Sequence, residues 1–171
     1  DPDARLPVEI LEGADAAGLR TLATPEEYGG AEPDRETQAQ TFALIAMEIA
    51  RGDAGLADKL VQNWKVSVLL REFAPEHLKE KWFTRLVEDP TFLLAHALTE
   101  PRGASDRWLP YNVPEAAMNT KAAFEDGHWV LNGRKQFIAH AGIARLYVVF
   151  TRTDPAKGMS EGCTSFLIPA G

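Results

Sequence analysis

The sequence contains a single cysteine, Cys163, among its 171 residues. One cysteine excludes an internal disulfide and is too few for a cysteine-based metal site. No apolar run approaches the roughly 20 residues that span a bilayer, and the acidic, polar N-terminus lacks the pattern of a secretory signal. We therefore expect a cytoplasmic protein of a reducing compartment, with Cys163 as a small buried hydrophobe in a strand.

Positive charge is also scarce, because 18 Lys and Arg face 25 Asp and Glu for a net charge of -7. This balance argues against a nucleic-acid binder and against docking on an anionic membrane. The motifs Gly-x-Ser-x-Gly, His-Glu-x-x-His, the phosphate-binding loop and paired cysteines are all missing. The four histidines lie in four different segments, and only His96 and His140 flank candidate site loops. The sequence thus offers no nucleophile–base pair and no metal-ligand cluster.

The first half of the chain has the apolar spacing of amphipathic helices. Asp34 and Asp53 are suitable N-caps, Pro75 suits a first helical turn, and Asp89-Pro90 ends the pattern. We predict helices over residues 6–18, 34–52, 54–70 and 75–87. Together they predict an all-α bundle, with residues 1–90 as the first domain.

The second half changes to short strands with a period of two. Asp126-Gly127 and Asn132-Gly133 are the strongest hairpin signals. We predict strands over residues 120–125, 128–131, 135–139, 145–151 and 164–168. Segregated helices and strands indicate an α+β fold, with residues 91–171 forming an antiparallel β-barrel. The last strand leaves little to close that barrel, so we expect a fragment or a chain that needs a partner.

One stretch, residues 94–106 (LAHALTEPRGASD), concentrates polar groups just past a strand. The apolar run stops at Thr99-Glu100-Pro101, because proline cannot donate to a sheet ladder. A glycine-containing turn and Ser105-Asp106 follow, and such a loop suits a polar or anionic ligand. The alternative is a simple strand exit with turn-forming residues.

Three segments in this order resemble the acyl-CoA dehydrogenase family. They are Pro25–Gly30 (PEEYGG), the stretch Ala97-x-Thr99-Glu100-Pro101 with Ser105-Asp106, and Trp129–Ile138 (WVLNGRKQFI). The resemblance implies a helical N-terminal domain and a β-barrel middle domain. A third, helical C-terminal domain of the family is absent from this sequence.

The resemblance also implies a bound FAD. It places the Leu98 backbone and Thr99 along the pyrimidine edge of the flavin, whose C=O and N–H groups a strand end and a hydroxyl can pair. Ser105 would reach the FAD pyrophosphate or the nearby substrate. For Thr99, the alternative role is to cap its own turn.

The same resemblance places Phe137 over one face of the isoalloxazine ring, where an aromatic side chain can stack. Ile138 and Ala139 follow as backbone contacts near flavin N5. For Phe137, the alternative is a position in the barrel core.

This sequence departs from the family pattern at three points. Where the family has a Thr or Ser hydroxyl bonded to N5, Ala139 has none, and one such bond is worth about 1 kcal/mol, or roughly 20 mV for a two-electron couple. The family's Ala-Gly-Ser-Asp is Gly103-Ala104-Ser105-Asp106, which displaces the glycine by one position. The loop over residues 107–119 is longer than the family norm, so it reshapes access for an unusual substrate.

The implied reaction is α,β-dehydrogenation of an acyl-CoA thioester by a homotetramer that passes electrons to an electron-transfer flavoprotein. The family's catalytic base is a carboxylate of the missing C-terminal domain, and Glu100 belongs to the flavin-side loop, so we assign no catalytic residue. Two alternatives stay open. One is a flavin-dependent oxidase or monooxygenase on the same fold, and the other is a non-catalytic subunit of a heteromeric flavoenzyme.

Overall fold

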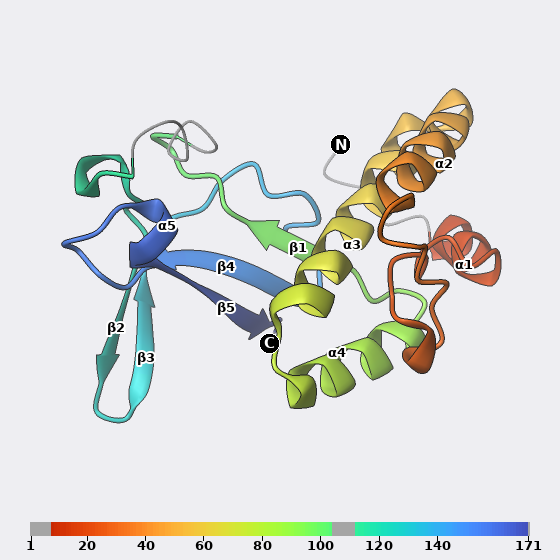
Figure 1. The fold of residues 1–171 in the computed structure, drawn as a ribbon. Coiled ribbons are helices and arrows are strands. Elements are labelled where there is room, and N and C mark those ends of the chain that lie inside the picture. Colours follow the sequence, from red (N-terminus) through yellow and green to blue (C-terminus); the bar gives the residue numbers. More distant parts are fainter. Residues whose placement is uncertain (1–7, 104–111, 171) are drawn as a thin grey trace. The chain divides into compact units, whose positions relative to one another are not determined.

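The computed structural model describes residues 8–103 and 112–170 (Figure 1). It divides into two compact units, Asp1–Ala95 with Gly142–Arg145, and His96–Ala141 with Leu146–Gly171. The first unit holds four helices and the second holds most of the strands, which confirms a helical part followed by a sheet part. The predicted domain limits of 1–90 and 91–171 stay a prediction.

The helices begin and end close to the predicted positions. They are α1 (Val8–Ala16), the 3₁₀ turn η1 (Glu26–Tyr28), α2 (Gln38–Gly52), α3 (Ala54–Phe73) and α4 (Glu76–Glu88). The Asp53 carboxylate accepts a hydrogen bond from Leu56 N at 3.0 Å and so caps α3. The Asp34 carboxylate accepts from Glu36 N at 2.7 Å, but α2 starts only at Gln38, so Asp34 stabilises the preceding turn.

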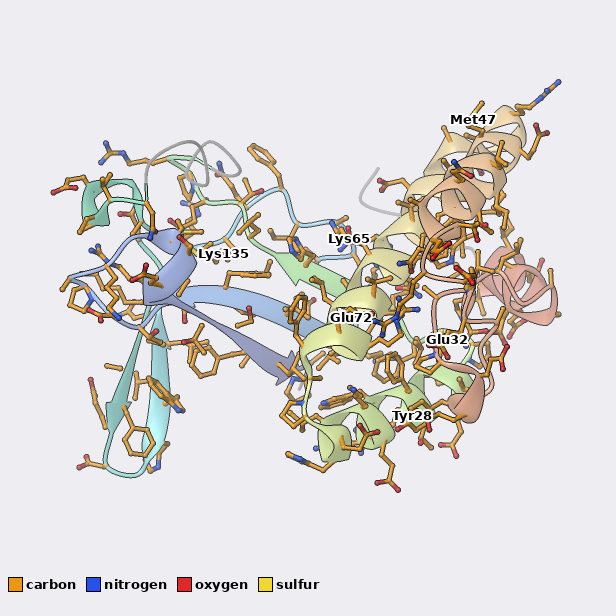
Figure 2. All side chains as sticks on the ribbon, in the orientation of Figure 1. Tyr28, Glu32, Met47, Lys65, Glu72 and Lys135 are labelled. Carbon is orange, nitrogen blue, oxygen red and sulfur yellow. The ribbon has the colours of Figure 1, made fainter. Side chains whose placement is uncertain are left out.

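The core of the first unit is centred on α3. Trp64 is 1% exposed and packs with Leu60, Leu22, Ala23 and Ala14. Phe42 of α2 stacks on Trp64 with ring centroids 5.3 Å apart. Tyr28 of η1, which is labelled in Figure 2, lies on Phe83 of α4 with centroids 5.3 Å apart, and its hydroxyl donates to Glu76 at 2.9 Å. Trp64 and Phe83 are buried core residues, as their helical spacing predicts, and Phe42 and Tyr28 are half-buried beside them.

A buried amide connects α3 to the first strand. Asn63 is fully buried, and its Oδ1 accepts a hydrogen bond from Leu94 N at 2.9 Å. Leu94 is the first residue of β1 (Leu94–Ala97), and the preceding residue, Leu93, accepts from Arg145 N at 2.8 Å. The start of β1 is therefore held by hydrogen bonds before the chain reaches Thr99.

The sheet has five strands, the first of which is β1. The others are β2 (Lys121–Glu125), β3 (His128–Asn132), β4 (Leu146–Arg152) and β5 (Cys163–Pro169). Their order is β1-β4-β2-β3, with β5 paired to β4. Antiparallel pairing aligns Leu146 with Pro169 and Arg152 with Cys163 in β4 and β5. A four-residue helix, α5 (Met159–Gly162), directly precedes β5.

The predicted hairpin at Asp126-Gly127 is confirmed. Strands β2 and β3 pair antiparallel, with Lys121 opposite Asn132 at one end and Glu125 opposite His128 at the other. Asp126 has φ +48° and Gly127 has φ +85°. Positive φ at both central residues is the requirement of the type I′ turn, whose twist matches that of the flanking strands.

Three predictions about the sheet are wrong. Among the described residues, the sheet is open and does not close into a barrel. It is also not purely antiparallel, because β2 pairs in parallel with β4, where Lys121 lies opposite Arg152. The predicted strand over residues 135–139 does not form, so Asn132-Gly133 does not close a second hairpin. Phe137 adopts φ +54°, which is outside the β region, and Gln136 N donates to Thr99 O at 3.0 Å.

No helix within the described ranges is both long and apolar enough to cross a bilayer. Cys163 lies in a strand as predicted, at the start of β5, where it is half-buried. Its thiol donates to Met159 Sδ at 3.5 Å, and burial raises its pKa.

The two phenylalanines Phe83 and Phe73 test the core of the first unit. Phe83 is 0% exposed, whereas Phe73 at the end of α3 is 81% exposed. We expect Phe83→Ala to lower the free energy of unfolding by about 3–5 kcal/mol, because it removes a buried ring and leaves a cavity. Phe73→Ala is the matched control and changes it by less than about 0.5 kcal/mol. Urea denaturation measures both, and equal losses would contradict this core.

Candidate functional site

The candidate site lies in the second unit, where β1 ends. Beyond Ala97 the chain continues through Leu98 and Thr99 to Glu100, which is 2% exposed. Glu100 N donates to Gly103 O at 2.9 Å, and Gly103 N donates back to Glu100 O at 3.2 Å. This tight turn over Pro101 and Arg102 ends the strand, as the proline predicts.

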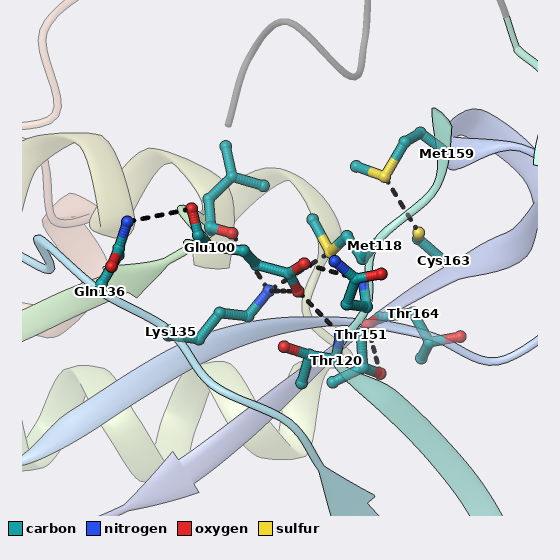
Figure 3. A network of polar contacts seen from close by, with 11 residues as sticks. Glu100, Met118, Thr120, Lys135, Gln136, Thr151, Met159, Cys163 and Thr164 are labelled. Carbon is teal, nitrogen blue, oxygen red and sulfur yellow. Dashed lines mark hydrogen bonds and ion pairs between the residues drawn. The ribbon is translucent and has the colours of Figure 1, made fainter. Parts of the chain in front are cut away.

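The Glu100 carboxylate is the most connected polar group of this region (Figure 3). Its Oε2 accepts from Asn119 N at 2.8 Å. Its Oε1 accepts from Thr120 N at 2.8 Å and from the Lys135 ammonium at 3.0 Å. One buried side chain thus connects the end of β1, the residues before β2 and the segment after β3.

These contacts decide the protonation state of Glu100. Burial by itself would raise the pKa of this carboxyl, because it disfavours the charged form. Hydrogen bonding from Thr120 and Asn119 and the ammonium of Lys135 outweigh burial and lower the pKa to about 2. The carboxylate is therefore ionised at neutral pH and already fully engaged, which makes it a poor general base.

The backbone at Gly133 passes close to Thr120, and this approach places Lys135 beside the Glu100 carboxylate. Gly133 follows β3 and passes over Thr120, so that a Cβ at residue 133 would lie 2.5 Å from Thr120 Cα. Only glycine fits such a contact. Two residues later, Lys135 Nζ donates to Leu98 O at 3.1 Å as well as to Glu100, and it lies 3.4 Å from Met118 Sδ.

The next residue, Gln136, joins the two segments a second time. Gln136 N donates to Thr99 O at 3.0 Å, and its side-chain Nε2 donates to Glu100 O at 3.3 Å. The carbonyls of Leu98 and Thr99 therefore both accept hydrogen bonds from residues 135 and 136. Each carbonyl keeps a second lone pair, and the Thr99 hydroxyl can both donate and accept, so this edge can pair with donors and with acceptors of a polar ligand.

Phe137 is exposed directly beside these contacts. Its exposed fraction is 88%, so it is not a core residue. Its φ of +54° is rare for an aromatic residue and costs conformational energy. Strained backbone of this kind persists where surrounding contacts impose it, and here Lys135 and Gln136 anchor the chain just before Phe137. The ring is held out as a free apolar surface.

The structure brings together most of the residues predicted for the site. Leu98 and Thr99 are half-buried, and their carbonyls accept hydrogen bonds from residues 135 and 136. Phe137 is the next residue along the chain and therefore lies close to them. Ile138 and Ala139, which are also half-buried, follow it. Ser105 lies outside the described residues. Sequence reasoning missed the Lys135–Glu100 pair, and the only signal was that a glutamate at a buried strand end requires a cation or N–H donors.

The histidines do not assemble a catalytic or metal centre. His96 of β1 makes an edge contact with Phe150 of β4 at 4.8 Å, and His140 is buried with φ +66°. In the part of the chain that the structure describes, no three His, Cys, Asp or Glu residues are grouped to hold a metal ion.

Glu100→Gln tests the polar network. An amide nitrogen cannot accept a hydrogen bond, so at least one of the donors from Asn119, Thr120 and Lys135 loses its partner, at a cost of about 1–3 kcal/mol in the free energy of unfolding. Because the folded-state pKa is lowered to about 2 from 4.5, the stabilisation is present above about pH 4.5 and is lost as the pH falls toward 2.

Denaturation measured between pH 7 and pH 2 checks this expectation. The variant should lose less stability than the parent over the acidic range. Glu125→Gln, at an exposed position in β2, is the matched control and should leave the stability at neutral pH within about 0.5 kcal/mol of the parent. A variant as stable as the parent would contradict the network.

Comparison with protein families gives two adjoining matches. Residues 1–89 match the family described as "Acyl-CoA dehydrogenase, N-terminal domain", and residues 95–171 match "Acyl-CoA dehydrogenase, middle domain". Among curated proteins, the chain is 32% identical over 173 residues to cyclohex-1-ene-1-carbonyl-CoA dehydrogenase of Syntrophus aciditrophicus. That alignment covers 100% of this chain and 38% of the relative.

Two solved structures show the same fold. Butyryl-CoA dehydrogenase from Megasphaera elsdenii superposes with a TM-score of 0.74 at 31% identity, covering 95% of this chain and 40% of that one. A structure described as PigA with FAD and proline superposes with a TM-score of 0.77 at 29% identity, covering 97% and 40%. The chain thus spans about two fifths of the length of these relatives. With both family domains matched in order along nearly its whole length, the chain belongs to the acyl-CoA dehydrogenase family.

Proposed function

We propose that this chain supplies the helical and sheet parts of an FAD-dependent enzyme that dehydrogenates an acyl-CoA thioester between its α and β carbons. The observation that carries the proposal is the exposed ring of Phe137, held at positive φ immediately after residues bonded to Leu98 and Thr99. This arrangement places an aromatic surface beside a polar strand end. The activity is proposed for the whole protein, and this chain spans about two fifths of the length of the relatives that it matches.

The residues fit a flavin. The isoalloxazine system joins a flat aromatic surface to a pyrimidine edge with carbonyl oxygens and ring nitrogens. Phe137 offers a ring for stacking, which is worth about 0.5–1.5 kcal/mol beyond the buried area. The Leu98 and Thr99 carbonyls each keep a second lone pair beside the bonds from Lys135 and Gln136, and the Thr99 hydroxyl can donate or accept, so the segment can pair with both the carbonyls and the N–H of that edge. Ile138 and Ala139 would lie along the ring near N5, and Ser105 would reach the pyrophosphate or the substrate.

Bound FAD supplies the acceptor for the hydride that leaves the β carbon of the substrate. The described residues bind and orient this group: Thr99 and the Leu98 backbone at one edge and Phe137 on one face. Glu100 does not serve as the base that removes the α proton, because its carboxylate is held by three donors with a pKa of about 2. We assign no catalytic base within this chain.

The remaining parts of the proposal concern the electron acceptor, the assembly and the compartment. We propose that electrons pass to an electron-transfer flavoprotein, that the protein assembles as a homotetramer, and that it acts in the cytoplasm. Acyl-CoA substrates are supported by the names of the cyclohexenecarbonyl-CoA and butyryl-CoA dehydrogenases to which the chain is similar.

A second candidate is a flavoenzyme of this fold that acts on a different substrate and reduces oxygen directly. The different substrate is supported by the similar structure described as PigA with FAD and proline. The two candidates differ in what reoxidises the reduced flavin, and an oxygen electrode distinguishes them.

An anaerobic titration of the natural full-length protein with a panel of acyl-CoA thioesters tests the proposed function. We expect one thioester to bleach the visible flavin band, because hydride transfer removes the absorbance of the oxidised ring. A flavin band that no thioester bleaches, together with rapid oxygen uptake by the chemically reduced protein, would favour the second candidate. No flavin band in excess FAD would exclude both and leave a non-catalytic subunit.

Phe137→Leu tests the stacking surface itself. We expect FAD affinity to fall by about 2- to 10-fold, because the variant keeps an apolar side chain but loses the ring interaction, worth about 0.5–1.5 kcal/mol. Phe124→Leu is the matched control, because Phe124 is a 62% exposed phenylalanine of β2 in the same unit. Fluorescence titration with FAD measures both. An unchanged affinity in Phe137→Leu would remove Phe137 from the site.

A further inference from the structure

The second unit contains a pair of opposite charges directly behind the candidate flavin edge. The Lys135 ammonium lies 3.0 Å from Glu100 Oε1, and the two side chains are 10% and 1% exposed. The same ammonium donates to Leu98 O at 3.1 Å. Figure 3 shows the Lys135 side chain extended toward the Glu100 carboxylate. A charge centre thus lies within one hydrogen bond of a residue proposed to meet the flavin.

The pair is electrically neutral as a unit. Two backbone N–H groups, of Asn119 and Thr120, also donate to the carboxylate, so neither charge is left without partners. Water does not screen such buried charges, so each acts strongly over a few ångströms. Their fields largely cancel while both are present. If one charge is removed, the other is left uncompensated beside Leu98 and Thr99.

We propose that Lys135 and Glu100 form a neutral positioning pair that keeps net charge away from the edge of the bound flavin, so that neither charge displaces its reduction potential, while the pair fixes residues 98–100 against residues 135–137. This inference rests on the proposed function. Reduction adds negative charge to the flavin ring system, so its potential responds to any net charge near the edge. The neutral pair holds the Leu98 and Thr99 backbone in place without favouring either redox state through a net charge.

Two single variants separate electrostatics from simple structural support. Glu100→Gln removes the negative charge and leaves a net positive charge, so the flavin potential should rise. Lys135→Met removes the positive charge and leaves a negative one, so the potential should fall. A purely structural role would lower FAD affinity in both variants without moving the potentials in opposite directions.

The experiment uses the natural full-length protein loaded with FAD, with potentials measured by equilibration against reference dyes and FAD affinities by fluorescence titration. Lys121→Met is the matched control, because Lys121 is an exposed lysine of β2, and it should leave the potential unchanged. Lys135→Arg retains the charge but alters the geometry. We expect it to keep the parent potential while FAD affinity falls at least 3-fold.

Opposite shifts in the two single variants support the proposal. Shifts in the same direction, or unchanged potentials in folded, FAD-loaded variants, overturn it. If one of these two variants fails to fold, the other decides together with Lys135→Arg: a shift in the expected direction beside a parent-like potential in Lys135→Arg supports the charge role, and an unshifted potential overturns it. A parent protein that binds no FAD contradicts the proposed function instead, so the two failures are distinguishable.

Discussion

The organisation of the second unit depends on one buried carboxylate. Burying the Glu100 charge is costly unless hydrogen bonds and an opposite charge compensate it. The donors come from two separate segments: Asn119 and Thr120 before β2, and Lys135 after β3. Satisfying this single group therefore requires those segments to meet at the end of β1. The arrangement of Leu98, Thr99 and Phe137 is a consequence of that requirement.

The features that the sequence predicts correctly depend on local chemistry. Asp53 caps α3, Asp89-Pro90 follows the end of α4, and Asp126-Gly127 closes the hairpin of β2 and β3, all from residues within a few positions of one another. Helical spacing also marks Trp64 and Phe83 as core residues. Propensity and turn chemistry are sufficient at these places because tertiary contacts agree with them.

The errors arise where distant contacts decide the backbone. The segment Lys135–Ala139 alternates like a strand, yet Lys135 is drawn to Glu100 and Gln136 to Thr99, and Phe137 then takes a positive φ. These partners are some 35 residues away, and no local pattern specifies them. Strand spacing likewise cannot show whether a sheet closes. Residue types at the candidate site were predicted through family resemblance, whereas the pair that supports them was visible only in three dimensions.

The Glu100 side chain also determines how this region tolerates change during evolution. One end of the stretch between β1 and β2 is fixed at Glu100 and Gly103, and the other at Asn119 and Thr120, and the same glutamate bonds both ends. Loop-closure entropy grows slowly, by about 0.6 kcal/mol for each doubling of length. Insertions and deletions between these two anchors therefore carry a small thermodynamic penalty and leave Leu98 and Thr99 where they are. The backbone at the end of β1 is in this way insulated from changes of chain length in the stretch that follows it.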